Sequence, residues 1–113
     1  MKIDVNLLAL PTRTKKGKNL MYAITFDLSV AQLEKHYPGN SYNNAYADIS
    51  KFLNMRGFDR QQGSVYFGNE TIDAVKTVMA VNAMSDELEW LKHCVNDIRM
   101  LRIEEVSDLS SAL

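Results

Sequence analysis

Two side chains of this sequence, the carboxylate of Asp27 and the hydroxyl of Ser64, are of types that can act on a phosphodiester bond. A carboxylate can take the proton of a ribose 2′-hydroxyl, or it can ligate Mg²⁺. A serine hydroxyl can donate a hydrogen bond to a phosphate oxygen. The two residues are far apart in the chain, so they can act together only if the fold brings them to one place.

The stretch Met21–Leu28 alternates between two kinds of side chain, which is the signature of a β-strand. One set points to one side of the strand and is apolar: Tyr22, Ile24, Phe26 and Leu28. The other set is small or polar: Ala23, Thr25 and Asp27. We therefore expect the apolar set to lie under helices and Asp27 to lie on the opposite face of the sheet.

The later residues predict a helix, a hairpin, a second helix and a last strand. Helical spacing predicts a helix over residues 41–56, which Gly57 ends, and another over 71–84 with Ile72, Val75, Val78 and Met79 on its core face. Strands are predicted over 58–61, 64–67 and 98–104, with the turn of the hairpin at Gln62-Gly63 and a short helix capped by Ser85 before the last strand. The order is βαββαβ, so we expect an α+β, ferredoxin-like fold with helices on one face of an antiparallel sheet.

This topology brings the two candidate residues together. The first and third strands are antiparallel neighbours, so the end of the first lies beside the start of the third. Alternation along the third strand, with Val65 and Phe67 taken as core, assigns Ser64 and Tyr66 to the open face with Asp27. The start of the last strand, with Asp97, Ile98 and Arg99, is expected close by.

An open sheet face is usually covered, and a symmetric homodimer is the commonest cover. Two copies of Asp27 would then approach across a two-fold axis, and their repulsion would either strengthen one carboxylate as a base or recruit Mg²⁺. Asp27 is thus a candidate general base and, if the reaction depends on metal, a candidate metal ligand. The structural alternative is a carboxylate that caps a turn at a strand end.

Four residues are candidates for RNA binding: Arg60, Gln62, Tyr66 and Arg99. Guanidinium groups grip phosphate with two hydrogen bonds, and aromatic rings stack on bases. Each has a structural alternative: ion pairs at a solvated strand edge for the arginines, shaping of the turn for Gln62, and a dimer interface for Tyr66.

Several function classes are disfavoured. The single cysteine, Cys94, excludes an internal disulfide and a cysteine-based zinc site. His36 and His93 have no partner at metal-ligand spacing in the sequence. The net charge of −1 speaks against sequence-blind binding of duplex DNA, which depends on many phosphate contacts.

The chain divides into a basic N-terminal extension, residues 1–20, and one domain, residues 21–113. The extension carries Arg13, Lys15, Lys16 and Lys18. Three interpretations stay open: a flexible tail, a phosphate-binding arm, or a segment that is not native because translation starts at Met21. No apolar run is long enough to cross a membrane and the N-terminus does not resemble a secretory signal, so we expect a cytoplasmic protein.

Several separated blocks of the sequence resemble the virulence-associated protein D (VapD) family. They are Met21–Leu28, Ala45–Ile49, Gly57-Phe58, Gln62–Tyr66, Val95–Arg99 and Glu104–Asp108. The resemblance covers Met21 to about Leu109. It departs from the family pattern in the N-terminal extension and at Met100-Leu101.

The resemblance implies a dimeric, ferredoxin-like endoribonuclease, in some bacteria the toxin of a toxin–antitoxin pair, so an antitoxin protein is an implied partner. It maps the family's strand-end aspartate to Asp27 and its hairpin serine to Ser64. The nearest rival is a non-catalytic nucleic-acid-binding dimer that uses the same fold as a scaffold, as CRISPR-adaptation subunits do. A module that senses small molecules is disfavoured, because the loop expected at Ser29–His36 has no glycine.

Overall fold

The structure, a computed structural model, describes residues 20–113. The predicted basic extension, residues 1–20, therefore lies outside the described residues except for Leu20. Among these, the elements are β1 (Met21–Leu28), α3 (Val30–His36), α4 (Asn44–Met55), β2 (Phe58–Gln62), β3 (Val65–Gly68), α5 (Ala74–Glu87), α6 (Leu91–Cys94), β4 (Val95–Ile103) and a 3₁₀ turn (Ser110–Ala112).

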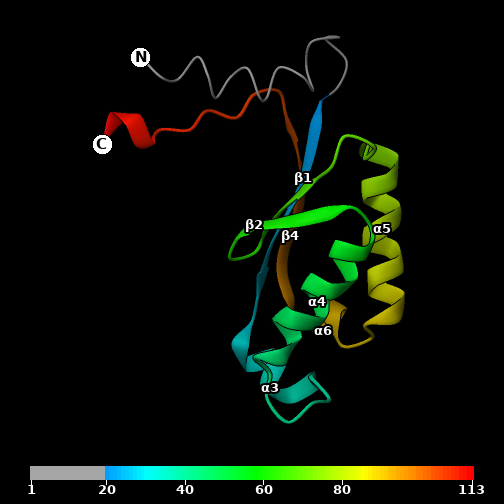
Figure 1. Cartoon of the computed structure of the whole chain (residues 1–113). Coiled ribbons are helices and arrows are strands. Elements are labelled where there is room, and N and C mark those ends of the chain that lie inside the picture. Colours follow the sequence, from blue (N-terminus) through cyan, green and yellow to red (C-terminus); the bar gives the residue numbers. More distant parts are fainter. Residues whose placement is uncertain (1–19) are drawn as a thin grey trace.

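The sheet has four strands in the order β2-β3-β1-β4, and every neighbouring pair is antiparallel. β1 thus lies between β3 and β4, as predicted. Figure 1 shows α4 and α5 together on one side of the sheet. The α+β class and the one-sided helical layer are confirmed, and the strand order is consistent with a ferredoxin-like fold.

The core forms between the apolar side of β1 and the helices. Ile24, Phe26 and Leu28 are buried, as the alternation predicts, whereas Asp27 is exposed. The largest buried contribution of α4 comes from Ile49, Phe52 and Leu53 at helical spacing; β2, β3 and the α6 region add Phe58, Tyr66, Trp90 and Leu91. The predicted end of α4 is also confirmed, since Gly57 has a φ of 96°, a left-handed conformation that favours glycine.

The hairpin strand β3 faces the opposite way from the prediction. Tyr66 is only 2% exposed, pairs with Ile24 across the ladder and stacks on Phe26 with ring centroids 6.0 Å apart. Val65 and Phe67 are instead half-buried on the open face, where Val65 pairs with Thr25. The placement of Tyr66 on the open face is therefore wrong: the larger ring fills the core, and the smaller Val65 is left outside.

Two helical predictions also need correction. The residues after β1 form a helix, α3, rather than a loop, and the side chain of Ser29 caps it by accepting a hydrogen bond from the Gln32 N–H. α5 buries Thr77, Ala80 and Met84, so its core face is rotated from the predicted one, and it runs through Ser85, which therefore does not cap a separate helix. Of the four residues expected inside, Ile72 is buried, whereas Val75, Val78 and Met79 are exposed.

The end of the molecule that carries α3 and α6 is tied together by aromatic contacts. The Tyr37 hydroxyl donates to Asp48 Oδ2 at 2.6 Å, and this bond raises the pKa of Tyr37 to about 12. The Tyr37 ring meets Trp90 edge-on at 5.0 Å, and His36 stacks on His93 at 4.8 Å.

Cys94 is buried beside them, and burial raises the pKa of its thiol, as suits a small core residue. Within residues 20–113 no helix is long and apolar enough to span a bilayer.

The reversed hairpin predicts a difference between neighbours. Tyr66→Ala should lower the free energy of unfolding by about 3–5 kcal/mol, because it empties a closely packed core position. In the monomeric chain, Phe67→Ala, on the opposite face of the same strand, should cost less than about 2 kcal/mol, because the ring is already half in water. Urea unfolding of both variants, at protein concentrations where the chain is monomeric, measures the difference, and equal losses would contradict this assignment of faces.

Candidate active site

Asp27 lies at the end of β1, where the ladder to β4 becomes irregular. Asp27 pairs with Asp97, but Leu28 pairs with Val95, so Asn96 is an extra residue that forms a bulge in β4. The Asn96 side chain donates from Nδ2 to Asp27 Oδ2 at 3.3 Å. The bulge thus places an amide donor against the exposed carboxylate.

A second carboxylate faces the first across the strands. Asp27 and Asp97 are directly opposed, a geometry that places Cβ atoms about 4.5–5.5 Å apart on one face of the sheet. Arg99 neutralises Asp97 by donating from Nε to both of its carboxylate oxygens, at 3.0 and 3.1 Å. This bond raises the pKa of the Arg99 guanidinium. Within residues 20–113, the amide of Asn96 is therefore the only side-chain donor to Asp27, while Asp97 is held in an ion pair.

Ser64 lies in the turn that leads into β3, beside the same end of β1. Its carbonyl accepts a hydrogen bond from the Phe26 N–H at 3.2 Å, so Ser64 is opposite the residue that precedes Asp27. This confirms that the topology brings the two segments together. Ser64 lies opposite Phe26 and not opposite Asp27, however. It belongs to the turn before β3, where the alternation of a strand does not apply, and it is half-buried. The strand pairing therefore leaves the shared open face of Ser64 and Asp27 a prediction.

The candidate RNA-binding residues are divided by the structure. Arg99 is exposed on the open face, across from Thr25, and is bound to Asp97. Arg60 is exposed but opposite the buried Tyr66, and its Nε donates to the Gly63 carbonyl at 2.9 Å, so it stiffens the hairpin turn. Gln62 is exposed. The ladder between β2 and β3 is irregular between Arg60 and Gln62, and Gln62 pairs with Val65. The burial of Tyr66 removes it from the surface.

The donor set suits a hard cation more than a soft one. Mg²⁺ prefers oxygen ligands and is often held by one or two carboxylates with waters completing its shell. Asp27 and Asp97 supply two such carboxylates on one face. Within the part of the chain that the structure describes, no group of three or more histidine, cysteine or acidic residues could hold a metal ion.

Two members of this cluster are not among the sequence-predicted site residues. Asp97 was expected in the neighbourhood, but its role opposite Asp27 depends on the register. Asn96 contacts the carboxylate only because of the bulge. The available signal was that Asn96 and Asp97 belong to one of the blocks that resemble the VapD family, Val95–Arg99.

The fold and the cluster define a class: a small α+β protein with opposed carboxylates, an amide and a guanidinium at the end of its central strand. No family model matches the chain. It is 47% identical over 93 residues to "Endoribonuclease VapD 2" of Riemerella anatipestifer, which covers 82% of this chain and 99% of that protein. It is 45% identical to "Endoribonuclease VapD homolog" of Helicobacter pylori (82% and 96% covered) and 43% identical to "Endoribonuclease VapD" of Dichelobacter nodosus (80% and 95% covered).

The chain belongs to the endoribonuclease VapD family. The resemblance that the sequence blocks indicate is confirmed by these relatives.

The opposed acids predict a stability signature. Like charges directly across a sheet repel, so Asp27→Asn should raise the free energy of unfolding by up to about 1 kcal/mol at low salt. The gain should shrink as salt screens the repulsion. Glu34→Gln, which removes an exposed acid from α3, is the control and should change little. Thermal melts at two salt concentrations measure both, and a loss of stability in Asp27→Asn would contradict the repulsion.

Proposed function

We propose that this protein cleaves RNA at the Asp27 end of its sheet. The observation that carries the proposal is the pair of opposed carboxylates, one bound to Arg99 and the other held only by Asn96. Opposed acids cost stability, so a free carboxylate at this position calls for a chemical reason. Membership of the endoribonuclease VapD family supplies the reaction class.

The simplest chemistry uses Asp27 as a general base. Asp27 takes the proton of a ribose 2′-hydroxyl, the 2′-oxygen attacks the adjacent phosphorus, and the bond from phosphorus to the 5′-oxygen breaks. The 5′-oxygen takes a proton from water, which gives a 2′,3′-cyclic phosphate and a 5′-hydroxyl, and Asp27 returns its proton to water. Arg99 would stabilise the charge that develops on the phosphate, while its Nε–H stays hydrogen-bonded to Asp97. Ser64, Gln62 and Arg60 would position the strand along the hairpin. Mg²⁺ on Asp27 and Asp97 would be the alternative use of the same carboxylates.

A homodimer through the open face would complete the site. That face carries Phe67, Leu101 and Ile103 around the small Ala23, so it is apolar enough to be buried. A two-fold axis there would bring Asp27 of each copy toward the other and shield both from water. A role as the toxin of a toxin–antitoxin pair, with an antitoxin as partner, and a cytoplasmic location both stay predictions.

The catalytic role of Asp27 has a direct test. Asp27→Asn should cut single-stranded RNA at least about 100-fold more slowly, because the amide cannot accept the proton. Asp59→Asn, which removes another exposed acid of the open face, should keep near-normal activity. Initial rates on a labelled RNA measure both variants.

The same assay separates the mechanisms. A substrate with 2′-deoxyribose at the cut should resist cleavage if the 2′-oxygen attacks, and EDTA should leave the rate unchanged. Cleavage of the deoxy substrate together with loss of activity in EDTA would assign Asp27 to a metal ion instead. An Asp27→Asn variant as active as the unaltered protein would contradict the proposed site, and RNA binding with no cleavage by any preparation would favour the non-catalytic scaffold.

The dimer interface can be tested with two adjacent residues of β4. Met100 and Leu101 are each 43% exposed but point to opposite faces of the sheet, Met100 opposite Ile24 and Leu101 opposite Ala23. Leu101→Arg should shift the protein to a monomer in analytical ultracentrifugation, because it buries a charge in the proposed interface. Met100→Arg should remain a dimer. The reverse result would place the interface at the α5 side of β4.

A further inference from the structure

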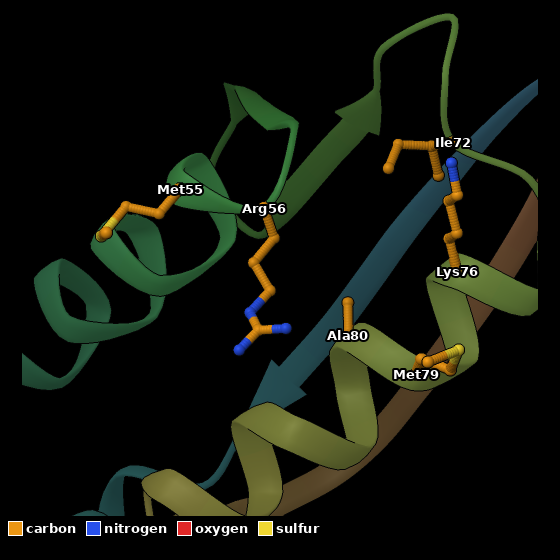
Figure 2. Close-up of a pocket in the computed structure, with 6 residues that line it drawn as sticks. All are labelled: Met55, Arg56, Ile72, Lys76, Met79 and Ala80. Carbon is orange, nitrogen blue, oxygen red and sulfur yellow. The ribbon is translucent and has the colours of Figure 1, made fainter.

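A groove runs between α4 and α5, on the side of the sheet away from the proposed active site. It has a volume of about 440 Å³, which is within the usual range of ligand pockets, about 300–1,000 Å³. Its walls are mainly apolar and its polar groups are cationic: Met55, Arg56, Ile72, Lys76, Met79 and Ala80 line it. Figure 2 shows Arg56 extending from the end of α4 into the space toward α5.

The two cations of the groove have no acidic partner among residues 20–113. The Arg56 guanidinium lies 4.6 Å from the centre of the Phe52 ring, and Lys76 Nζ donates to the Thr71 carbonyl at 3.0 Å. The ion pairs among the described residues involve only the cations Arg99 and Arg102. The groove therefore presents two positive charges beside exposed methionine side chains.

The end of the described chain has the complementary character. Residues 104–113 contain three acids and no lysine or arginine. Leu109 is 70% exposed and Leu113 is fully exposed, and the two flank the 3₁₀ turn Ser110–Ala112. Asp108 caps this turn by accepting from the Ser110 N–H at 2.8 Å, and the hydrogen bonds from Ser110 lower the pKa of Asp108, which keeps it anionic.

This segment, residues 104–113, is poorly placed to bind the groove between α4 and α5 of the same copy of the chain. Val106 lines a cavity with Met21 and Phe67, so the segment leaves the molecule on the open side of the sheet. The groove is on the helical side. Figure 1 shows the C-terminal end far from α4 and α5. Ten extended residues span about 33 Å, enough to reach a neighbouring molecule.

We propose that the groove between α4 and α5 binds residues 104–113 of a second copy of the chain. Arg56 and Lys76 would meet the acids of the segment, and Leu109 and Leu113 would pack against Met55, Met79 and Ile72. Methionine-lined grooves adapt to such apolar anchors. The groove lies away from Asp27 and from the open face, so the proposal goes beyond the proposed function and its test is independent of RNA cleavage.

RNA is the main competing occupant, since phosphate would also be attracted to Arg56 and Lys76. The apolar walls favour the peptide, because they would contribute little to a phosphate backbone.

The test uses the full chain with its own segment disabled by Asp108→Lys, Leu109→Ser and Leu113→Ser, all at exposed positions. A fluorescein-labelled peptide of residues 104–113 should bind this protein in anisotropy titrations. Adding Arg56→Glu and Lys76→Glu should weaken binding at least tenfold, whereas adding Lys35→Glu and Lys92→Glu, which reverses two charges outside the groove, should not. A peptide with serine at both leucine positions should also bind at least tenfold more weakly. Thermal melts check that each variant is folded.

Three outcomes would overturn the proposal. One is peptide binding that the groove substitutions leave unchanged. Another is a short single-stranded RNA that binds in a way that depends on Arg56 and Lys76 while the peptide does not bind. The last is an unaltered chain that binds the labelled peptide equally weakly at all protein concentrations, because its segment would then occupy the groove of the same copy. Resistance that grows with protein concentration supports exchange between copies.

Discussion

The pairing of β1 between β3 and β4 is the constraint on which the rest of this structure depends. It leaves β1 with two hydrogen-bonded neighbours, so its side chains have only two directions in which to point. Burial of Ile24, Phe26 and Leu28 under the helices then forces Asp27 to the open face. A slip of one residue would exchange the two sets, and the cost of burying Asp27 in place of Phe26 makes that register untenable.

The sequence was most informative where one set of alternating residues was clearly apolar and the other was not. β1 satisfied this condition and was predicted with the correct face, and helical spacing predicted α4 together with its end at Gly57. β3 did not: Val65 and Phe67 compete with Tyr66, and only the fit of the Tyr66 ring against Phe26 decides between them. α5 is similar, since Val75 and Val78 are more apolar than Thr77, yet Thr77 is buried because its hydroxyl is satisfied by the Asp73 carbonyl at 2.8 Å.

The candidate site was predictable only in part, for a different reason. Asp27 follows from alternation, and its nearness to the hairpin follows from topology. The partners that give Asp27 its character depend on the bulge at Asn96, and an irregularity of one residue in a ladder leaves no periodic signal. The register of β1 with β3, which pairs Thr25 with Val65, explains why Ser64 lies opposite Phe26 and not opposite Asp27, although their segments touch. The composition of the site thus depends on defects in the ladders at the end of the sheet, and such defects commonly accompany active sites.

The exposure of Asp27 connects the proposed chemistry to the proposed assembly. In water a carboxylate is stabilised in its charged form and is a weak base. Burial and a second nearby carboxylate both disfavour that form, which strengthens the acid as a proton acceptor. A second copy seated on the open face would provide both, by excluding water and by bringing its own Asp27 near. A monomer of the protein therefore has the side chains of the site in place, but it lacks the water-excluding environment that would make Asp27 a stronger base.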